Sequence, residues 1–263
     1  MPDAKRRSCV RRPTRIAALL LMFASALAGG SLRAGLPPAT VKGKVTGWEK
    51  LLPQVYAEAA KNDSRGYSWR EPSPTVKQDF RRLSANVSRD VCVVALGTGA
   101  PQAHEPVAIR VTGGRMTPST IVLAPGSRLS FKNVDPFPHV LYELPRRDAP
   151  KDAQRDAPRE EWAASPTAPG SAREWAAGSA GVHEIRDQLF PSVVMYVVVD
   201  PAAVEFAYPE RDGAFSMALP PGDYSFKAFF DGKQAGKDLA SLHVPEHGLF
   251  ELREPMALGS DAK

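Results

Sequence analysis

Residues 107–144 read VAIRVTGGRMTPSTIVLAPGSRLSFKNVDPFPHVLYEL, and this stretch decides the fold class. Apolar and polar residues alternate over 107–111 and over 128–132, which is the pattern of strands with one buried face. Glycine and proline pairs at 113–114 and 125–126 mark tight turns beside these runs. Short strands joined by turns predict a β-sandwich.

Further strand signals lie on both sides of this stretch and predict an all-β class. The apolar runs Val91–Leu96 and Val193–Val199 are typical of buried strands. Tyr224–Phe230 alternates, and the dipeptide 231–232, Asp-Gly, is a hairpin signal that predicts a partner strand near 238–244. The 25 prolines and 20 glycines agree with short elements joined by turns. The sequence shows no long helical periodicity after its N-terminal segment.

Composition divides the chain into segments. We expect an N-terminal β-rich segment over 39–97, a central domain over 105–200 and a last β segment over 201–255. Residues 145–180 are rich in Ala, Pro, Arg, Asp and Glu and hold one β-branched residue, Thr167, which predicts a disordered insertion in the central domain. The pattern leaves open whether 39–97 folds independently or adds strands to another segment.

The N-terminus is typical of a signal peptide over 1–28. Basic residues come first, and an apolar stretch over 16–27, too short to span a membrane, leads to the small-residue cleavage pattern at 26–28. We therefore expect a periplasmic or extracellular protein with no membrane span after cleavage, the alternative being an uncleaved anchor. Residues 1–28 hold six of the 34 basic and one of the 29 acidic residues, which leaves 28 of each. This balance gives no reason to expect nucleic-acid binding.

Three side chains have two interpretations each. Trp162 and Trp175 lie in the predicted insertion, where they either pin it to the domain or to a partner, or stay exposed. Cys92 is the only cysteine left once Cys9 is removed with the signal, so it has no partner for an internal disulfide. Its apolar neighbours favour a packed core thiol over a reactive one.

The order of turn and polar residues in the central stretch resembles the first half of plastocyanin-like cupredoxins. The residues that carry the resemblance are Pro118, Gly126, Leu129–Phe131, Asn133, Asp135 and His139. A later motif is similar to carboxypeptidase-regulatory or transthyretin-like domains, through Asp212, Gly213, Phe215, Pro220, Pro221, Gly222 and Tyr224. The resemblance implies a cupredoxin-like Greek-key β-sandwich with additional transthyretin-like strands.

The same resemblance implies a copper loop that this chain has largely lost. Exported cupredoxin-like proteins, including methylamine-utilisation proteins, carry a Cys-x-x-His-Pro-x-Met loop. Alignment on Pro191 puts Asp187 at the cysteine, Phe190 at the histidine and Val193 at the methionine. Of the four expected ligands only His139 remains. A blue-copper centre needs two imidazoles and a thiolate in a plane with a weak axial thioether, so the resemblance predicts a degenerate copper site.

The remaining histidines leave alternatives open. His139 is either a relic metal ligand or a structural residue that hydrogen-bonds its loop and packs beside Phe137. His183 and Met195 would replace lost ligands only if the loop shifted register. His243 and His247 have a helical metal-site spacing, but Pro245 lies between them, which favours surface histidines. His104 has no partner nearby in the sequence.

These observations predict an exported, non-enzymatic β-sandwich that binds an unknown envelope protein or glycan, with no cofactor. Enzyme motifs such as G-x-S-x-G, H-E-x-x-H and Cys-x-x-Cys are missing from the sequence, and the adjacent acids 160–161 lie in the predicted insertion. The first alternative is a copper protein for electron transfer or copper carriage, built on His139. The second is a hydrolase of envelope polymers, for which the sequence offers no positive feature.

Overall fold

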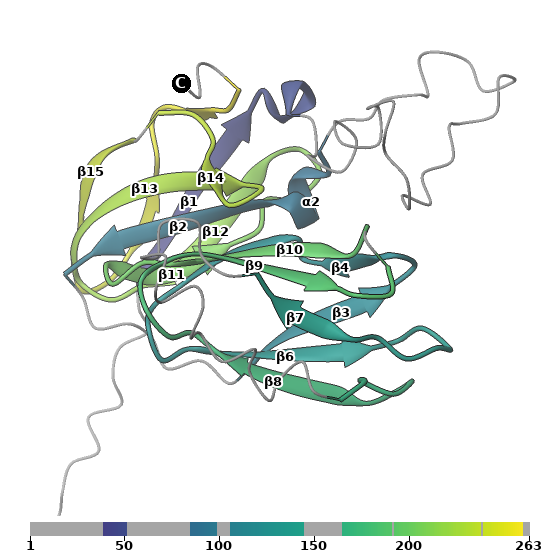
Figure 1. Cartoon of the computed structure of the whole chain (residues 1–263). Helices are drawn as coiled ribbons and strands as arrows, with labels where there is room; N and C mark the ends of the chain where they lie inside the picture. The colour runs from purple at the N-terminus through teal and green to yellow at the C-terminus, as the bar shows by residue number, and fades with distance from the viewer. Residues whose placement is uncertain are drawn as a thin grey trace, which may run out of the picture. The chain divides into compact units, whose positions relative to one another are not determined.

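Two β-sandwiches make up the part of the chain that the computed structural model describes, which is residues 39–51, 85–98, 106–144, 165–190, 192–237 and 239–259 (Figure 1). These residues belong to one compact unit, Leu36–Lys263. The predicted signal over 1–28 lies outside the described residues, as do His104, the acids 160–161, Trp162 and Pro191.

The central sandwich is formed by eight strands between Val107 and Val199. One sheet has the order β4 (Arg115–Thr117), β3 (Val107–Thr112), β6 (Arg128–Asn133) and β8 (Ala172–Ala176). The other has the order β5 (Thr120–Leu123), β10 (Val194–Val199), β9 (Gly181–Asp187) and β7 (Leu141–Glu143). Ile109 and Phe131 from the first sheet share one buried cluster with Ile185 of the second, so the sheets pack face to face.

The terminal sandwich combines strands from both ends of the described chain. One sheet has the order β12 (Ala214–Leu219), β1 (Ala39–Thr46) and β16 (Leu249–Glu251), with β17 (Met256–Ala257) also paired to β1. The other has the order β11 (Ala203–Ala207), β2 (Val91–Gly97), β13 (Gly222–Phe230) and β14 (Lys233–Gln234), with β15 (Leu239–Val244) paired to β13. Two short helical turns, η1 (Trp48–Lys50) and α2 (Val87–Asp90), flank these strands.

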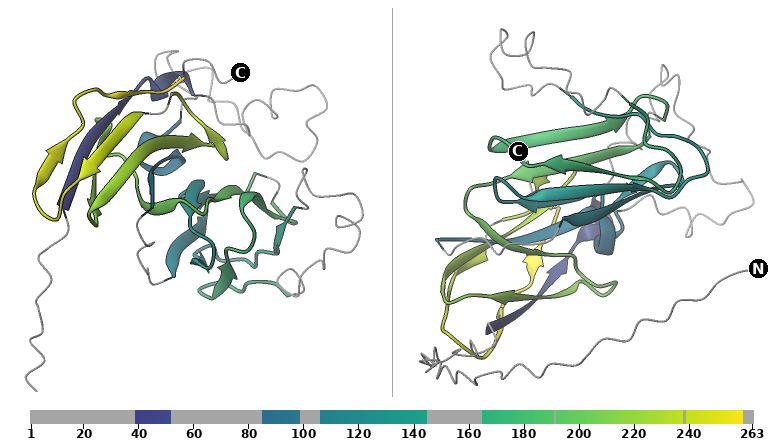
Figure 2. Two further views of the ribbon diagram at one scale, coloured as in Figure 1. Left: turned by 90° about the vertical axis from the view of Figure 1, so that its left-hand side faces the viewer. Right: turned by 90° about the horizontal axis from the view of Figure 1, so that it is seen from below.

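A third apolar cluster, here called the junction cluster, joins the two sandwiches. Strands β2 and β13 of the terminal sandwich supply Cys92, Val94 and Phe229, while β5 and β10 of the central sandwich supply Val122 and Val198. Strands β2, β5 and β10 of the two facing inner sheets are therefore covered on both faces, which is why their residues are nearly all buried and, except for Thr120, nearly all apolar. Figure 1 labels β2 and β13 of one inner sheet and β9 and β10 of the other, and Figure 2 gives two further views of the same strands.

Polar contacts of Thr120 reinforce this junction. The buried Thr120 carbonyl accepts a hydrogen bond of 2.9 Å from the Tyr208 hydroxyl, and its Oγ1 accepts one of 3.0 Å from the Asp231 amide. Asp231 and Gly232 both have positive φ, at 48° and 72°, and form the tight turn between β13 and β14. The predicted hairpin signal is confirmed, and β15 supplies the partner strand expected near 238–244.

The all-β prediction is confirmed, and the expected strands are present over the described residues. The prediction of a disordered insertion over 145–180 is wrong for 172–176, where β8 pairs with β6 and buries Trp175. A composition averaged over the whole insertion missed this strand, because an edge strand needs only one apolar side chain on its inner face and a backbone partner. Residues 145–164 lie outside the described part.

The structure also decides how the first segment folds. Its strands do not form a unit of their own: β1 pairs with β12, and β2 pairs with β11 and β13. The segments 39–97 and 201–255 therefore build one sandwich together. In the described part of the chain, neither helical turn has the length or apolar character needed to cross a membrane.

Candidate functional site

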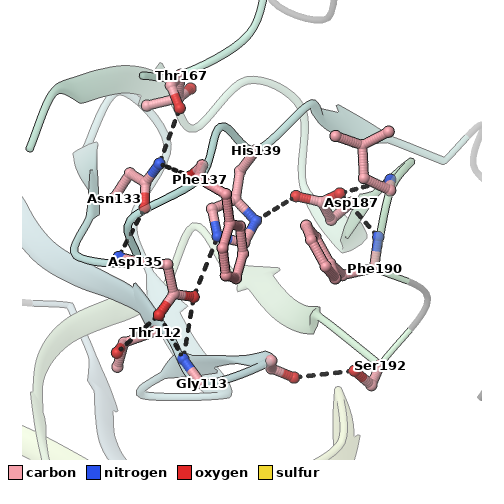
Figure 3. A network of polar contacts seen from close by, with 12 residues as sticks. Thr112, Gly113, Asn133, Asp135, Phe137, His139, Thr167, Asp187, Phe190 and Ser192 are labelled. Carbon is pink, nitrogen blue, oxygen red and sulfur yellow. Dashed lines mark hydrogen bonds and ion pairs between the residues drawn. The ribbon is translucent and has the colours of Figure 1, made fainter. Parts of the chain in front are cut away.

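His139 lies at one end of the central sandwich, in the connection between β6 and β7. Figure 3 shows the polar contacts around it. Its side chain is completely buried. Backbone hydrogen bonds with Thr167 in both directions hold the residue in place, with N···O distances of 3.1 and 2.7 Å. Both ring nitrogens face carboxylates: Nδ1 is 2.6 Å from Oδ2 of Asp187, and Nε2 is 3.2 Å from Oδ2 of Asp135.

Asp187 ends strand β9 and organises the loop that follows it. Its Oδ1 accepts hydrogen bonds from the amides of Leu189 and Phe190, at 2.6 and 3.0 Å, while Oδ2 faces the imidazole. The side chain is buried. A carboxylate suits this position because short side-chain acceptors commonly bond amides two and three residues ahead. Asp187 therefore links the loop after β9 to the loop that carries His139.

Asp135 forms the corresponding link on the other side of the ring. It accepts hydrogen bonds from the Gly113 amide, at 2.9 Å to Oδ1, and from the Thr112 hydroxyl at 3.3 Å. Asn133 sets the position of Asp135, since Oδ1 of Asn133 accepts the Asp135 amide and its Nδ2 donates to the Phe137 carbonyl. The motif Asn-x-Asp followed by a histidine is thus the framework of a loop.

Hydrogen bonds from several sides hold the Asp135–His139–Asp187 network. Both aspartates accept backbone amides, and a carboxylate oxygen of each also faces a ring nitrogen of His139. The imidazole and the amides of Gly113, Leu189 and Phe190 together provide the polar partners that buried carboxylates need.

Aromatic rings enclose the imidazole above the network. Phe137 and Phe190 lie 5.3 and 5.2 Å from the His139 ring and 4.7 Å from each other. A further contact, from the Ser192 hydroxyl to the Gly114 carbonyl at 3.1 Å, joins two of the loops. The loops at this end are thus held together by buried polar contacts, while Phe137 and Leu189 remain 37% and 54% exposed.

The donors at this end do not fit a copper centre. Nδ1 and Nε2 of His139 are both engaged by carboxylates, and Phe190 and Val193 have no donor atom at the positions where the resemblance expects ligands. Cys92 lies in the junction cluster rather than at this end, and burial raises the pKa of its thiol to about 12. Among the described residues, no group of three or more His, Cys, Asp or Glu side chains is arranged to hold a metal ion.

The other candidate residues lie elsewhere. His183 is buried beside Glu143, whose carboxylate accepts the Trp175 indole N–H at 3.0 Å. Met195 belongs to the core of the central sandwich, so neither His183 nor Met195 joins His139. His243 is exposed and lies 2.8 Å from Asp223, and His247 is also exposed, as the sequence predicted.

Sequence analysis identified His139 and its alignment partner Asp187 but missed the second carboxylate. The spacing of Asp135 and His139, four residues apart in one loop, was a usable signal for a contact. Asp187 lies 48 residues after His139, so only the alignment pointed to it. No local sequence pattern predicts the contacts of Glu143 with His183 and Trp175, because the three residues lie on three different strands.

No protein-family model matches the chain, and no curated protein matches it. Solved structures of cupredoxins do match. Amicyanin from Paracoccus versutus is 13% identical over 41% of this chain and 97% of its own, with a TM-score of 0.29. Plastocyanin from Dryopteris crassirhizoma is 13% identical over 36% of this chain and 100% of its own, with a TM-score of 0.30.

A third match is a copper-containing nitrite reductase from Thermus scotoductus SA-01, 16% identical over 40% of this chain and 25% of its own, with a TM-score of 0.30. Scores this low carry no inference about function. The chain is an all-β protein with cupredoxins among its structural neighbours.

Proposed function

We propose that the protein is an exported, non-enzymatic binding module in which a buried Asp–His–Asp network replaces a copper centre. The observation that carries this proposal is that both ring nitrogens of His139 are engaged by carboxylates. A nitrogen in a hydrogen bond of 2.6 Å with an oxygen has no lone pair available for a metal unless that bond is broken.

The network gives the module what a binding scaffold needs, which is loops held in fixed positions. Three loops, around Gly113, His139 and Leu189, are joined through the two aspartates. Binding residues in proteins are concentrated on loops that a rigid framework positions. In this proposal the module acts in the periplasm or cell envelope, and its partner is a protein or a glycan.

Copper titration tests the metal-free part of the proposal. The purified protein should contain no stoichiometric copper, and isothermal titration with Cu²⁺ should reveal no tight site at His139. The His139→Ala variant should therefore titrate like the parent protein. A His243→Ala variant is the control, because an exposed histidine is the kind of side chain that binds Cu²⁺ weakly at a surface.

The copper-protein alternative makes the opposite prediction. Stoichiometric copper in the parent that disappears in His139→Ala, but not in His243→Ala, would establish a site at His139 and overturn the proposal.

A further inference from the structure

The outer face of the sheet β4-β3-β6-β8 is positively charged. Residues 106–144 contain four basic side chains, and all four lie on this sheet and are exposed: Arg110, Arg115, Arg128 and Lys132. Their strand neighbours Ile109, Met116 and Phe131 are buried in the central core. Because side chains alternate along a strand, the four basic residues project from the opposite, outer face.

Strand register brings the charges close together. Arg110 is the direct partner of Lys132 on the adjacent parallel strand, where backbones lie about 4.8 Å apart. Arg115 pairs with Thr112, two residues from Arg110 on the same face. Like charges directly opposite each other destabilise a sheet, so the fold alone gives no reason for this arrangement.

The acidic side chains of residues 106–144 form contacts away from these basic groups. Asp135 and Glu143, the two acidic residues of 106–144, bond to His139 and His183 respectively. The acid on the outer face of β8 is Glu174, which lies 3.7 Å from Arg128. Within the described residues, no ion pair joins Arg110, Arg115 or Lys132 to an acid.

The remaining side chains of this face narrow the class of partner. By strand alternation and register they are small or hydroxylic: Ala108, Thr112, Thr117, Ser130, Ala172 and Ala176. Among the described residues of these four strands, the outer face carries no aromatic ring to stack on nucleic-acid bases and no Leu, Ile, Met or Phe to enter a bilayer; the exposed apolar Val134 follows β6. Guanidinium and ammonium groups beside hydroxyls suit an extended chain of carboxylates and hydroxyls.

We propose that this outer face binds an acidic polysaccharide, a polymer whose sugars carry carboxylates. The proposal deepens the binding function stated above by naming the class of partner, and it rests on that function. Binding would be salt-sensitive, because the contacts are between exposed charges. Since the chain outside residues 1–28 has equal numbers of basic and acidic residues, attraction to a polyanion would depend on this face rather than on net charge.

The test compares two charge-reversed proteins. Arg110→Glu/Lys132→Glu alters the proposed face, while Lys42→Glu/Lys44→Glu alters two exposed lysines of β1 and changes the net charge equally. Binding to polygalacturonate is measured at low salt, with neutral dextran as a blank. The parent should bind polygalacturonate, the first variant about tenfold or more weakly, and the second as the parent does.

Several results would overturn the proposal. These are no binding by the parent, equal losses in both variants, or equally tight parent binding to single-stranded DNA or to phosphatidylglycerol vesicles. If the glutamate variant fails to fold by circular dichroism, Arg110→Gln/Lys132→Gln replaces it, with the same direction of effect. Copper titration does not involve this face, so failure here would be distinguishable from failure of the metal-free site.

Discussion

His139 lies at the centre of a buried network that joins three loops. An imidazole between two carboxylates, with two tilted aromatic rings beside it, is a structural element that fixes three loops. The cost of desolvating this network is offset only while all its members are present, because a buried charge without its partner is strongly unfavourable. The residue therefore contributes to stability through its hydrogen bonds with the two buried aspartates.

Removal of the ring should destabilise the protein strongly. His139→Ala leaves Asp135 and Asp187 buried without their shared partner, and we expect a loss of about 3–5 kcal/mol in the free energy of unfolding. His243→Ala is the matched control, since it removes an exposed histidine that also faces an aspartate, and it should cost less than about 1 kcal/mol. Urea denaturation measures both, and equal losses would show that the buried network contributes nothing special.

Cys92 makes stability fall at alkaline pH. Burial raises the pKa of its thiol from 9.0 to about 12, so between these values the folded protein holds a proton that the unfolded chain releases. Unfolding is then favoured as pH rises, by about 1.4 kcal/mol per pH unit across the window from 9 to 12. Below pH 9 both states keep the proton, and the effect vanishes.

The comparison that isolates this effect is between the parent and Cys92→Ala. Urea midpoints measured from neutral pH into the alkaline window should fall more steeply for the parent than for the variant. Parallel pH profiles in the two proteins would mean that the thiol ionises as readily folded as unfolded.

At the level of elements, the turn between β13 and β14 illustrates a contact that depends on glycine. Gly232 has φ of 72°, and a Cβ there would lie 2.9 Å from Val182 Cγ1 and 3.0 Å from Tyr196 Cδ1. Gly126 has φ of 84° but no atom within 4 Å of its Cβ position. The two glycines share a left-handed φ, which would strain any residue with a Cβ, but only Gly232 has atoms close to the Cβ position.

Alanine substitutions at Gly126 and Gly232 separate the cost of a left-handed φ from the cost of close contacts. Gly126→Ala should cost about 1–2 kcal/mol from left-handed strain alone. Gly232→Ala should cost more, because the terminal sandwich would have to move away from strands β9 and β10 of the central one. Thermal denaturation of both variants checks the order, and a Gly232→Ala loss no larger than that of Gly126→Ala would contradict the close approach.

Strands were predictable from sequence where periodicity or apolar runs are strong, as at Val107–Val111 and Val91–Leu96. Strand β8 was not, because its signal is one tryptophan in a polar segment and its stability comes from pairing with β6. One of the two carboxylate partners of His139 was predictable, because the alignment put Asp187 near His139. Which carboxylate each ring nitrogen contacts depends on loop geometry that no local pattern encodes.

For the described part of the molecule, the junction cluster should make the two sandwiches unfold together. Cys92, Val122 and Val198 are buried between the inner sheets, and Thr120 adds two hydrogen bonds. A continuous apolar core of this kind couples domains that would otherwise unfold separately. Trp48 and Trp175 pack on different sandwiches and so report on each one.

Single-tryptophan proteins test this coupling. With Trp69 and Trp162 replaced by phenylalanine, a further Trp175→Phe leaves Trp48 as the reporter, and Trp48→Phe leaves Trp175. The two fluorescence transitions in urea should have the same midpoint once corrected for the stability of each variant by circular dichroism. Transitions separated in midpoint would show that the junction does not couple the sandwiches.

The ring nitrogens of His139 give the most direct test of the central proposal, that a hydrogen-bonded network replaces a copper centre. Long-range ¹H–¹⁵N NMR, with His139→Gln to assign the signals, reports whether each nitrogen carries a proton. The account predicts that the signals of both ring nitrogens stay unchanged when Cu²⁺ is added, because each nitrogen is in a hydrogen bond with a buried carboxylate. A ring-nitrogen signal that disappears with one equivalent of Cu²⁺ would contradict it.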